Sequence, residues 1–497
     1  MKTEIKSKSL EVEFDQLTQT TRKVSKWWTM LGVGIGVFIL ALDVYIINLA
    51  LPIMVESLHT SFAMIQWVVL SYLLAIAIFV LSAAKLGDMW SKKWLYITGL
   101  IVFTISSLFC GIAPTVHFLI IFRFLQGLGA AFISGLGTAM IVEVFPPEER
   151  GLGLGIRAGI FGLGIMLGPT IGGLLISLGD WPLIFLINVP IGIIGCSIVA
   201  YFVPSSVIIP GKQTFDWIGT LILTLTLTCF TLGITLLQSE NFSYQIALTL
   251  IVASVISLIG FLLAETNLPD PMLDFKIFKS LEFSLGLTLR FLGNFVMAGV
   301  IFMLPFFLKL VQNYPTEQAG LLLAIPPIII VLTAPIAGFL SDRYGSRSIS
   351  LMGLILMAIG CLLVSTFDTE LTTINYIIEI IPYGLGVGMF QSPNNSAIMG
   401  AAPKDQLGIA SGLLSLSRIL GQIAGVPLVG ALFSFITITH ANLISGIDVT
   451  NAPIKSLVFG TQITFRVVAV LLVISTLFAV GVWWLELRKD KSLIKTD

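Results

Sequence analysis

Long apolar runs separated by short polar segments recur along the chain, and they predict fourteen membrane-spanning helices. Each run holds about 20 residues, the length of helix that crosses a hydrocarbon core about 30 Å thick. The pattern therefore predicts an all-α polytopic membrane protein. The predicted spans are 30–53, 63–84, 94–113, 117–141, 154–178, 184–204, 217–238, 246–264, 284–309, 316–340, 348–367, 373–400, 409–437 and 463–486.

The distribution of Lys and Arg predicts the orientation of these spans. An even number of spans places both termini on one side of the membrane. With the N-terminus in the cytosol, most of the 27 basic residues fall in the tails or in cytosolic loops, as the positive-inside rule requires. We therefore expect a multi-pass protein of the cell membrane with two cytosolic tails, 1–29 and 487–497.

Composition narrows the possible functions. Only 11% of the residues are charged, against about 25% in soluble domains, and the net charge is zero, so nothing indicates a nucleic-acid partner. The four cysteines lie inside apolar runs without CxxC spacing or a neighbouring His, which argues against a metal site or a disulfide framework. The three His residues are far apart, and no HExxH, Walker A or GxSxG pattern has a credible context. We expect no enzymatic activity, no metal and no cofactor.

An internal repeat predicts two bundles of helices. The loop after the second span reads AAKLGDMWSKKWLYITG, and the loop after the tenth reads GFLSDRYGSRSISLMG. We expect six-helix bundles at 30–204 and 284–486, joined by a segment, 205–283, that carries two extra spans. The charged loops are either ordinary positive-inside loops or a conformational latch between the bundles, and their recurrence at matching positions favours the latch. The latch residues are Asp88, Lys92 and Lys93 in the first loop and Asp342, Arg343 and Arg347 in the second.

The fifth span, GIRAGIFGLGIMLGPTIGG, is unusually rich in glycine. Each Gly costs about 1 kcal/mol against Ala in an aqueous helix. In a bilayer the helix persists, because an unpaired backbone amide in hydrocarbon costs more. The glycines form a flat face for close helix packing, and Pro169 bends the axis. The alternatives are an ordinary GxxxG contact face and a specialised contact in which Gly168 and Pro169 lie where the two bundles meet.

These motifs resemble those of a known family. The fifth span matches all fixed positions of motif C, the antiporter motif of major facilitator superfamily exporters: Gly155, Gly164, Gly168, Pro169, Gly172 and Gly173. The charged loops resemble motif A of that superfamily, although the first copy has Met89 in place of Arg, so we expect it to form the weaker latch. Segments 41–52, 122–131 and 181–192 resemble further motifs of the fourteen-span drug:proton antiporters. The resemblance implies export driven by proton influx, with twelve core spans around a central cavity.

Ionisable residues inside spans are the candidates for proton coupling, since burying one near the bilayer centre costs at least ~2.5 kcal/mol. Asp43 lies midway along the first span, where burial favours the neutral carboxyl and allows it to bind and release a proton. A purely structural hydrogen bond is the alternative. Arg123 either pairs with Asp43 and changes the affinity of its carboxyl for protons, or serves only as a structural counter-charge.

Other polar residues have weaker assignments. Arg290 and Arg418 come early in their spans, so side chains that reach back to the cytosolic surface are the simple interpretation. Glu143 and Arg157 flank a short loop and are expected to clamp the fourth and fifth spans together. The residues that we place as possible cavity lining are Asn48, Gln126, Asn188, Arg290 and Asn294.

The cargo is the least determined feature. Asp43 is the only acidic residue placed near mid-membrane, so strongly cationic substrates are not favoured. We expect a monomer whose partners are protons, the bilayer and a lipophilic small molecule such as a drug. The alternatives on the same fold are an exporter of an endogenous lipid, siderophore or metabolite, a proton-coupled nutrient importer and a non-transporting sensor.

Overall fold

The computed structural model describes residues 2–146, 149–204, 217–236, 244–267, 275–402, 407–441 and 448–493, and all of its regular elements are helices. Fourteen stretches of these described residues are long and apolar enough to cross a membrane, which confirms the predicted all-α polytopic fold. They lie close to the predicted spans. The first helix begins at Lys2, so the predicted polar tail continues directly into the first span.

The first half of the structure holds six spans. They are formed by α1 (Lys2–Ser57), α2 (Phe62–Met89), α3 (Lys92–Gly111), α4 (Val116–Val144), α5 (Arg150–Gly179), and the pair α6 (Leu183–Leu186) and α7 (Asn188–Phe202). Ser61 and Thr115 precede α2 and α4, and each side chain accepts a hydrogen bond from a first-turn amide. The sixth span is interrupted at Ile187, which places Asn188 at the start of a new helix.

Two further spans and then a second half follow. The extra spans are α8 (Trp217–Leu236) and α9 (Tyr244–Asn267), with 205–216 of the predicted linker outside the described residues. The second half, after the short 3-10 helix η2 (Phe275–Lys279), consists of α10 (Leu281–Phe306) with the π-helical turn η3 (Phe307–Val311), α11 (Thr316–Leu323), α12 (Ile325–Tyr344), α13 (Ser346–Val364), α14 (Thr373–Ala401), α15 (Leu407–Ala441), the 3-10 turn η5 (Val449–Asn451) and α16 (Ile454–Leu493).

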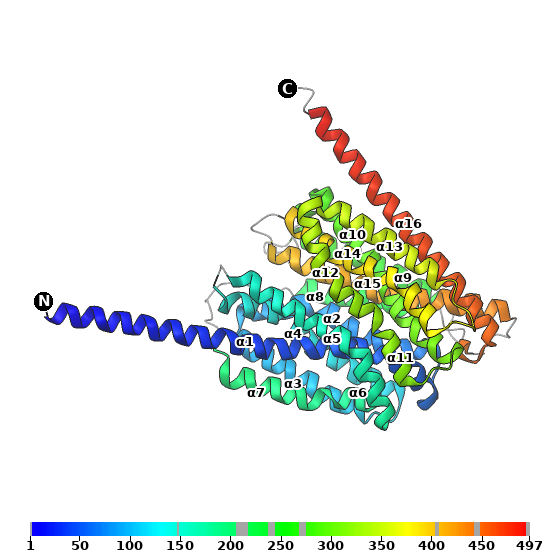
Figure 1. The fold of residues 1–497 in the computed structure, drawn as a ribbon, viewed down its shortest axis with the longest axis horizontal. Helices are drawn as coiled ribbons and strands as arrows, with labels where there is room; N and C mark the ends of the chain where they lie inside the picture. Colours follow the sequence, from blue (N-terminus) through cyan, green and yellow to red (C-terminus); the bar gives the residue numbers. More distant parts are fainter. Residues whose placement is uncertain are drawn as a thin grey trace.

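Corresponding spans pack in the same way in both halves. In the first half α1 packs on α5, α4 packs on α2 and α3, and α7 packs on α1 and α3. In the second half α10 packs on α15, α14 packs on α12 and α13, and α16 packs on α13 and α10. This repeated packing supports the proposed bundles 30–204 and 284–486. Figure 1 shows the helices of the first half, coloured from blue to green, beside those of the second half, coloured from yellow-green to red.

The two halves meet at the end of the molecule opposite the termini. Phe62, at the start of α2, packs against Phe302, Phe306 and Phe433 of the second half. On α5, a Cβ at Gly162 would touch Val331 of α12, whereas at Gly159 and Gly155, one and two turns nearer the termini, it would meet nothing within 4 Å. These three residues share one helical face, so the halves diverge toward the termini. In Figure 1 the terminal ends of α1 and α16 project away from each other.

Candidate functional site

Three side chains converge on the fully buried carboxylate of Asp43 in α1. Arg123 Nη1 donates to Oδ2 at 2.6 Å, while Gln126 Nε2 and Asn188 Nδ2 donate to Oδ1 at 2.9 and 3.0 Å. Arg123 and Gln126 are three residues apart on α4 and therefore share a face. The interruption at Ile187 directs Asn188 toward the same point. The structure thus brings together four of the predicted site residues from α1, α4 and α7.

Arg123 also links this site to α2. Its Nε donates to the backbone oxygen of Val68 at 2.9 Å, its Nη1 donates to Gln126 Oε1 at 2.7 Å, and its guanidinium lies 4.2 Å from the centroid of the Tyr72 ring. Gln126 in turn donates to Ser107 Oγ of α3 at 2.7 Å. Sequence reasoning missed Tyr72 and Ser107, because nothing distinguishes them from other residues of their spans. Arg123 and Gln126 are thus each held by a further neighbouring helix.

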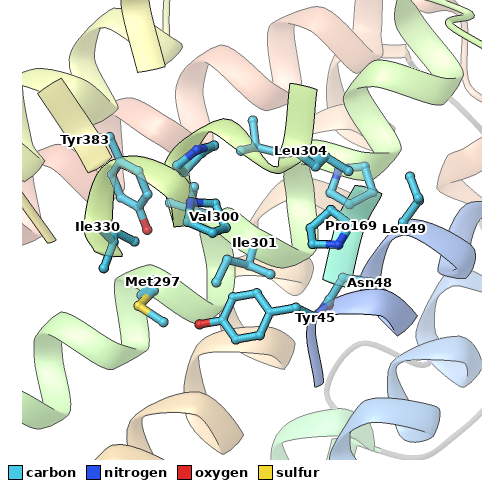
Figure 2. Close-up of a pocket in the computed structure, with 14 residues that line it drawn as sticks. Tyr45, Asn48, Leu49, Pro169, Met297, Val300, Ile301, Leu304, Ile330 and Tyr383 are labelled. Carbon is cyan, nitrogen blue, oxygen red and sulfur yellow. The ribbon is translucent and has the colours of Figure 1, made fainter. Parts of the chain in front are cut away.

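A mostly apolar cavity lies next to this polar site, between helices of both halves. Its volume is about 30 Å³, and it is lined from α1, α5, α10, α12 and α14, among other elements. Figure 2 shows Tyr45 and Tyr383 on opposite sides, with Met297 between them and Pro169 beside Asn48. Asn48 is the one predicted cavity residue that lines this space. Its Nδ2 donates to the backbone oxygen of Val44 at 2.7 Å.

Arg290 and Asn294 lie elsewhere in the second half. Arg290 is only 5% exposed, and its Nε donates to the backbone oxygen of Leu414 in α15 at 2.8 Å, with a further bond to Asn395. Asn294 Nδ2 donates to the backbone oxygen of Arg290 at 2.8 Å. The interpretation that Arg290 reaches back to the membrane surface is wrong, because partners inside the bundle satisfy its guanidinium.

The glycines of α5 face different partners. A Cβ at Gly164, Gly168 or Gly172 would collide with α1, for example with the backbone oxygen of Phe38 at 2.8 Å in the case of Gly164. Gly173 and Pro169 instead lie against α11, where a Cβ at Gly320 would sit 2.5 Å from the Pro169 oxygen. The expectation that Gly168 touches the other half is therefore wrong, whereas Pro169 does lie where the halves meet.

One basic residue of each charged loop forms an ion pair within its own half. Lys92 Nζ lies 3.6 Å from Glu143 Oε2 of α4, and Arg347 Nη2 lies 3.0 Å from Glu282 Oε1 of α10. Lys93 is buried beside Trp94, and Asp342 and Arg343 are exposed. The side chain of Asp88 is outside the described set. A latch between the halves thus remains a prediction for a conformation closed at the terminal end.

The expected clamp between Glu143 and Arg157 is wrong. Glu143 pairs with Lys92, and Glu149 pairs with Lys26 of α1. The buried Nε of Arg157 has no hydrogen-bond partner among the described residues. Arg157 instead lies within electrostatic range of Tyr96 in α3 and Arg418 in α15. The fifth span therefore directs this guanidinium into the bundle.

Comparison with known proteins identifies the family. The family model of the Major Facilitator Superfamily matches residues 33–426 and 287–496. The chain is 32% identical to the riboflavin transporter RibZ of Clostridioides difficile (strain 630) over 82% of this chain and 88% of that protein. It is 28% identical to the tetracenomycin C resistance and export protein of Streptomyces glaucescens, over 82% of this chain and 76% of that protein.

A solved structure shares the fold. It is that of a bacterial homolog of the human lysosomal transporter Spinster, in an inward-facing and unoccupied conformation. The TM-score is 0.68 at 18% sequence identity, and the match covers 92% of this chain and 96% of the other. At this identity the likeness concerns the fold alone.

Proposed function

This chain belongs to the major facilitator superfamily, and we propose that it is a proton-coupled exporter of lipophilic small molecules that works by alternating access. Motif C and the similarity to an antibiotic export protein support export. Contacts between the halves gather at the end opposite the termini, which suits one state of an alternating-access cycle. With both termini in the cytosol of a cell-membrane protein, this state is inward-facing. We further propose a monomer that needs no cofactor.

The observation that carries proton coupling is the environment of Asp43. Among the described residues it is the only acidic side chain that is buried, and Arg123, Gln126 and Asn188 hold it. A buried ion pair is stable only while both charges are present. Protonation of Asp43 removes one charge and weakens its link to α4, while Arg123 stays bonded to α2 through Val68. A proton thus changes which helices are held together, which is what coupling requires.

A second candidate is an exporter or importer of an endogenous metabolite on the same machinery. The 32% identity to a riboflavin transporter favours this candidate. The two functions differ in cargo and direction, and both use the same halves and the same cavity. Transport of flavins and drugs should therefore be measured in one preparation.

The test is transport into inverted membrane vesicles with an imposed pH gradient, screened over dyes, flavins and lipids. Asp43→Asn should abolish gradient-driven transport, because an amide does not bind and release a proton near neutral pH, while it keeps one of the two oxygens that Arg123 and Gln126 use separately. Glu379→Gln is the matched control, since Glu379 lies in α14, is partly exposed and bonds Thr366. Undiminished pH-driven transport by the Asp43 variant would remove the proposed coupling role.

A further inference from the structure

Two side-chain amides bond the carboxylate of Asp43, and they differ in how many of their own polar atoms are used. In Gln126 both ends are used: Oε1 accepts from Arg123 Nη1 at 2.7 Å, and Nε2 donates to Asp43 Oδ1 and to Ser107 Oγ. In Asn188 only Nδ2 is used, as the donor to Asp43 Oδ1 at 3.0 Å. The other end, the buried Oδ1 of Asn188, has no hydrogen-bond partner among the described residues. A buried acceptor without a partner lowers stability, and in native proteins such a group often has a functional role.

The amide of Gln126 is held in one orientation, whereas that of Asn188 is not. If the Gln126 amide turned over, its NH2 group would face the donating Nη1 of Arg123. Half a turn of the Asn188 amide about its Cβ–Cγ bond exchanges Nδ2 and Oδ1. Within the part of the chain that the structure describes, this turn breaks only the bond to Asp43. Asn188 is therefore the amide that can present either a donor or an acceptor to this carboxyl group.

Protonation of Asp43 changes which partner the carboxyl group needs. A carboxylate only accepts hydrogen bonds, whereas the neutral acid also has an O–H group that donates. Arg123 holds Oδ2, and the two amides hold Oδ1. A proton on Oδ1 leaves Oδ2 as a carbonyl oxygen that still accepts from Arg123. The new O–H group then lies along the line of the former bond from Asn188 and needs an acceptor there.

The titratable groups around Asp43 come from three helices. Arg123 of α4 only donates hydrogen bonds. The Tyr72 ring of α2 lies 4.2 Å from the Arg123 guanidinium, and Cys110 Sγ of α3 lies 3.9 Å from Gln126 Oε1, but neither side chain bonds Asp43. Helices α5, α6, α7, α10 and α11 also pack on α1, and none of their described titratable side chains bonds Asp43. The Asn188 amide is thus the neutral group with an unused acceptor that already contacts the carboxyl group.

The place of Asn188 in the sixth span gives its bond to Asp43 a mechanical consequence. Asn188 begins α7 directly after the interruption at Ile187, and Pro190 has no amide hydrogen to bond the carbonyl of Leu186. Helix α7 itself packs on α1 and α3. When the ion pair between α1 and α4 loses a charge, a bond from the neutral acid to Asn188 keeps α1 attached to α7. Proton binding thus weakens one link of α1 and preserves the other.

We propose that Asn188 recognises the protonated state of Asp43, by turning its amide so that its Oδ1 accepts the hydrogen bond of the neutral acid. The proton comes from the bulk solvent. The hydrogen bond from Asn188 Nδ2 breaks, the one from the Asp43 O–H forms, and no covalent bond of Asn188 changes. This role rests on the proposed function of Asp43 in proton coupling and adds the sixth span to it.

The test is infrared difference spectroscopy of the purified full-length protein between a pH at which Asp43 is ionised and one at which it is protonated. The side-chain carbonyl of asparagine is isotopically labelled, so that asparagine bands can be identified. On protonation one asparagine carbonyl band should move to lower wavenumber, because Oδ1 gains a hydrogen bond. Asp43→Asn should remove this shift together with the carboxyl band, and Asn188→Leu should remove the asparagine shift while the carboxyl band remains. Tyr72→Phe is the matched control, since it removes another buried hydroxyl without a described partner and should leave both signals in place.

The outcomes separate this role from the coupling proposal. A carboxyl band without an asparagine shift in the unaltered protein, or a shift that persists in Asn188→Leu, would overturn the role of Asn188. If Asn188→Leu does not fold, the unaltered protein and Asp43→Asn still decide, because neither is changed at position 188. In inverted vesicles Asn188→Leu should lower gradient-driven transport about tenfold, and Asn188→Thr, whose hydroxyl both donates and accepts, should restore part of it. An asparagine shift in a protein whose transport ignores the pH gradient would overturn the proposed coupling alone.

Discussion

At the residue scale, the ion pair of Asp43 and Arg123 stands out because burying its two charges costs desolvation free energy. Both side chains are at most 1% exposed, so both charges have lost their water. Desolvation of this kind costs several kcal/mol per ion, and it is offset only when additional hydrogen bonds satisfy the remaining lone pairs and protons. Gln126, Asn188 and the Val68 oxygen supply these bonds. The pair is therefore stable as long as it is complete.

Arg123→Gln should destabilise the protein by about 3–5 kcal/mol at neutral pH, because it leaves Asp43 buried without a counter-charge. Adding Asp43→Asn should return much of that stability, since no charge is then left alone. Unfolding temperature in detergent is the measurement, and Arg466→Gln is the control. A double variant no more stable than Arg123→Gln would show that the pair contributes through packing instead of charge.

At the element scale, the contact between α1 and α5 depends on glycine. Three glycines of α5, spaced four residues apart, let the two backbones approach closely, at Gly164, Gly168 and Gly172. In a bilayer, close van der Waals packing of this kind is a main source of helix association. Gly155 belongs to the same sequence motif but faces open space in this conformation. The glycines of the motif therefore lie on two different faces of α5, one packed on α1 and one open.

Gly164→Ala should be destabilising, by about 1–3 kcal/mol as for other overpacked sites. Its methyl group would lie 2.8 Å from the Phe38 oxygen and 3.1 Å from the Leu42 nitrogen, and backbone atoms move only with their helix. Gly155→Ala on the same helix is the matched control and should not lower stability, since nothing lies within 4 Å. Equal unfolding temperatures for the two variants would contradict the proposed difference between the faces.

At the scale of the whole molecule, the halves are held together opposite the termini. Besides the aromatic cluster around Phe62, the carboxylate of Asp448 accepts a hydrogen bond from the Phe62 amide at 2.7 Å. This residue precedes η5 in the second half and thereby caps the start of α2 in the first. Opening that end of the transporter would require this bond to break.

Asp448→Ala should favour opening at the end opposite the termini. Loss of a capping interaction of about 1 kcal/mol corresponds to roughly a fivefold change in the ratio of states. A cysteine introduced at Leu49, buried near the contact between halves, should be labelled faster by an impermeant reagent. Thr450→Val is the control, because Thr450 Oγ1 bonds the same carboxylate without linking the halves. Unchanged labelling would mean that the aromatic cluster alone holds this end closed.

Met89→Arg should act at the opposite end. A planar guanidinium at the end of α2 can strengthen the proposed first latch by about 1 kcal/mol if the new pair is partly desolvated. A cysteine at Gly155, which faces open space here, should then be labelled more slowly from the terminal side. Met89→Lys is the control: it adds the same charge without the planar guanidinium, so it separates the effect of charge from that of bidentate bonding. Faster labelling with Arg would contradict a latch at this position.

The spans and the fold class followed from the sequence alone, which also marked Asp43 and Arg123 as candidates for proton coupling and Gln126 and Asn188 as candidate cavity residues. Spans can be recognised because each needs about 20 apolar residues and bonds all of its backbone groups within the helix. A polar or charged residue inside such a run is therefore easy to find in the sequence. The sequence does not show which side chains meet, because that depends on how the helices pack. Asp43 and Asn188 are 145 residues apart, Glu143 pairs with Lys92 and not with Arg157, and Gly168 packs on α1. Such pairings depend on the rotation of each helix about its axis, which is set by packing against neighbours distant in the chain and not by the hydrophobicity that places the helix in the membrane.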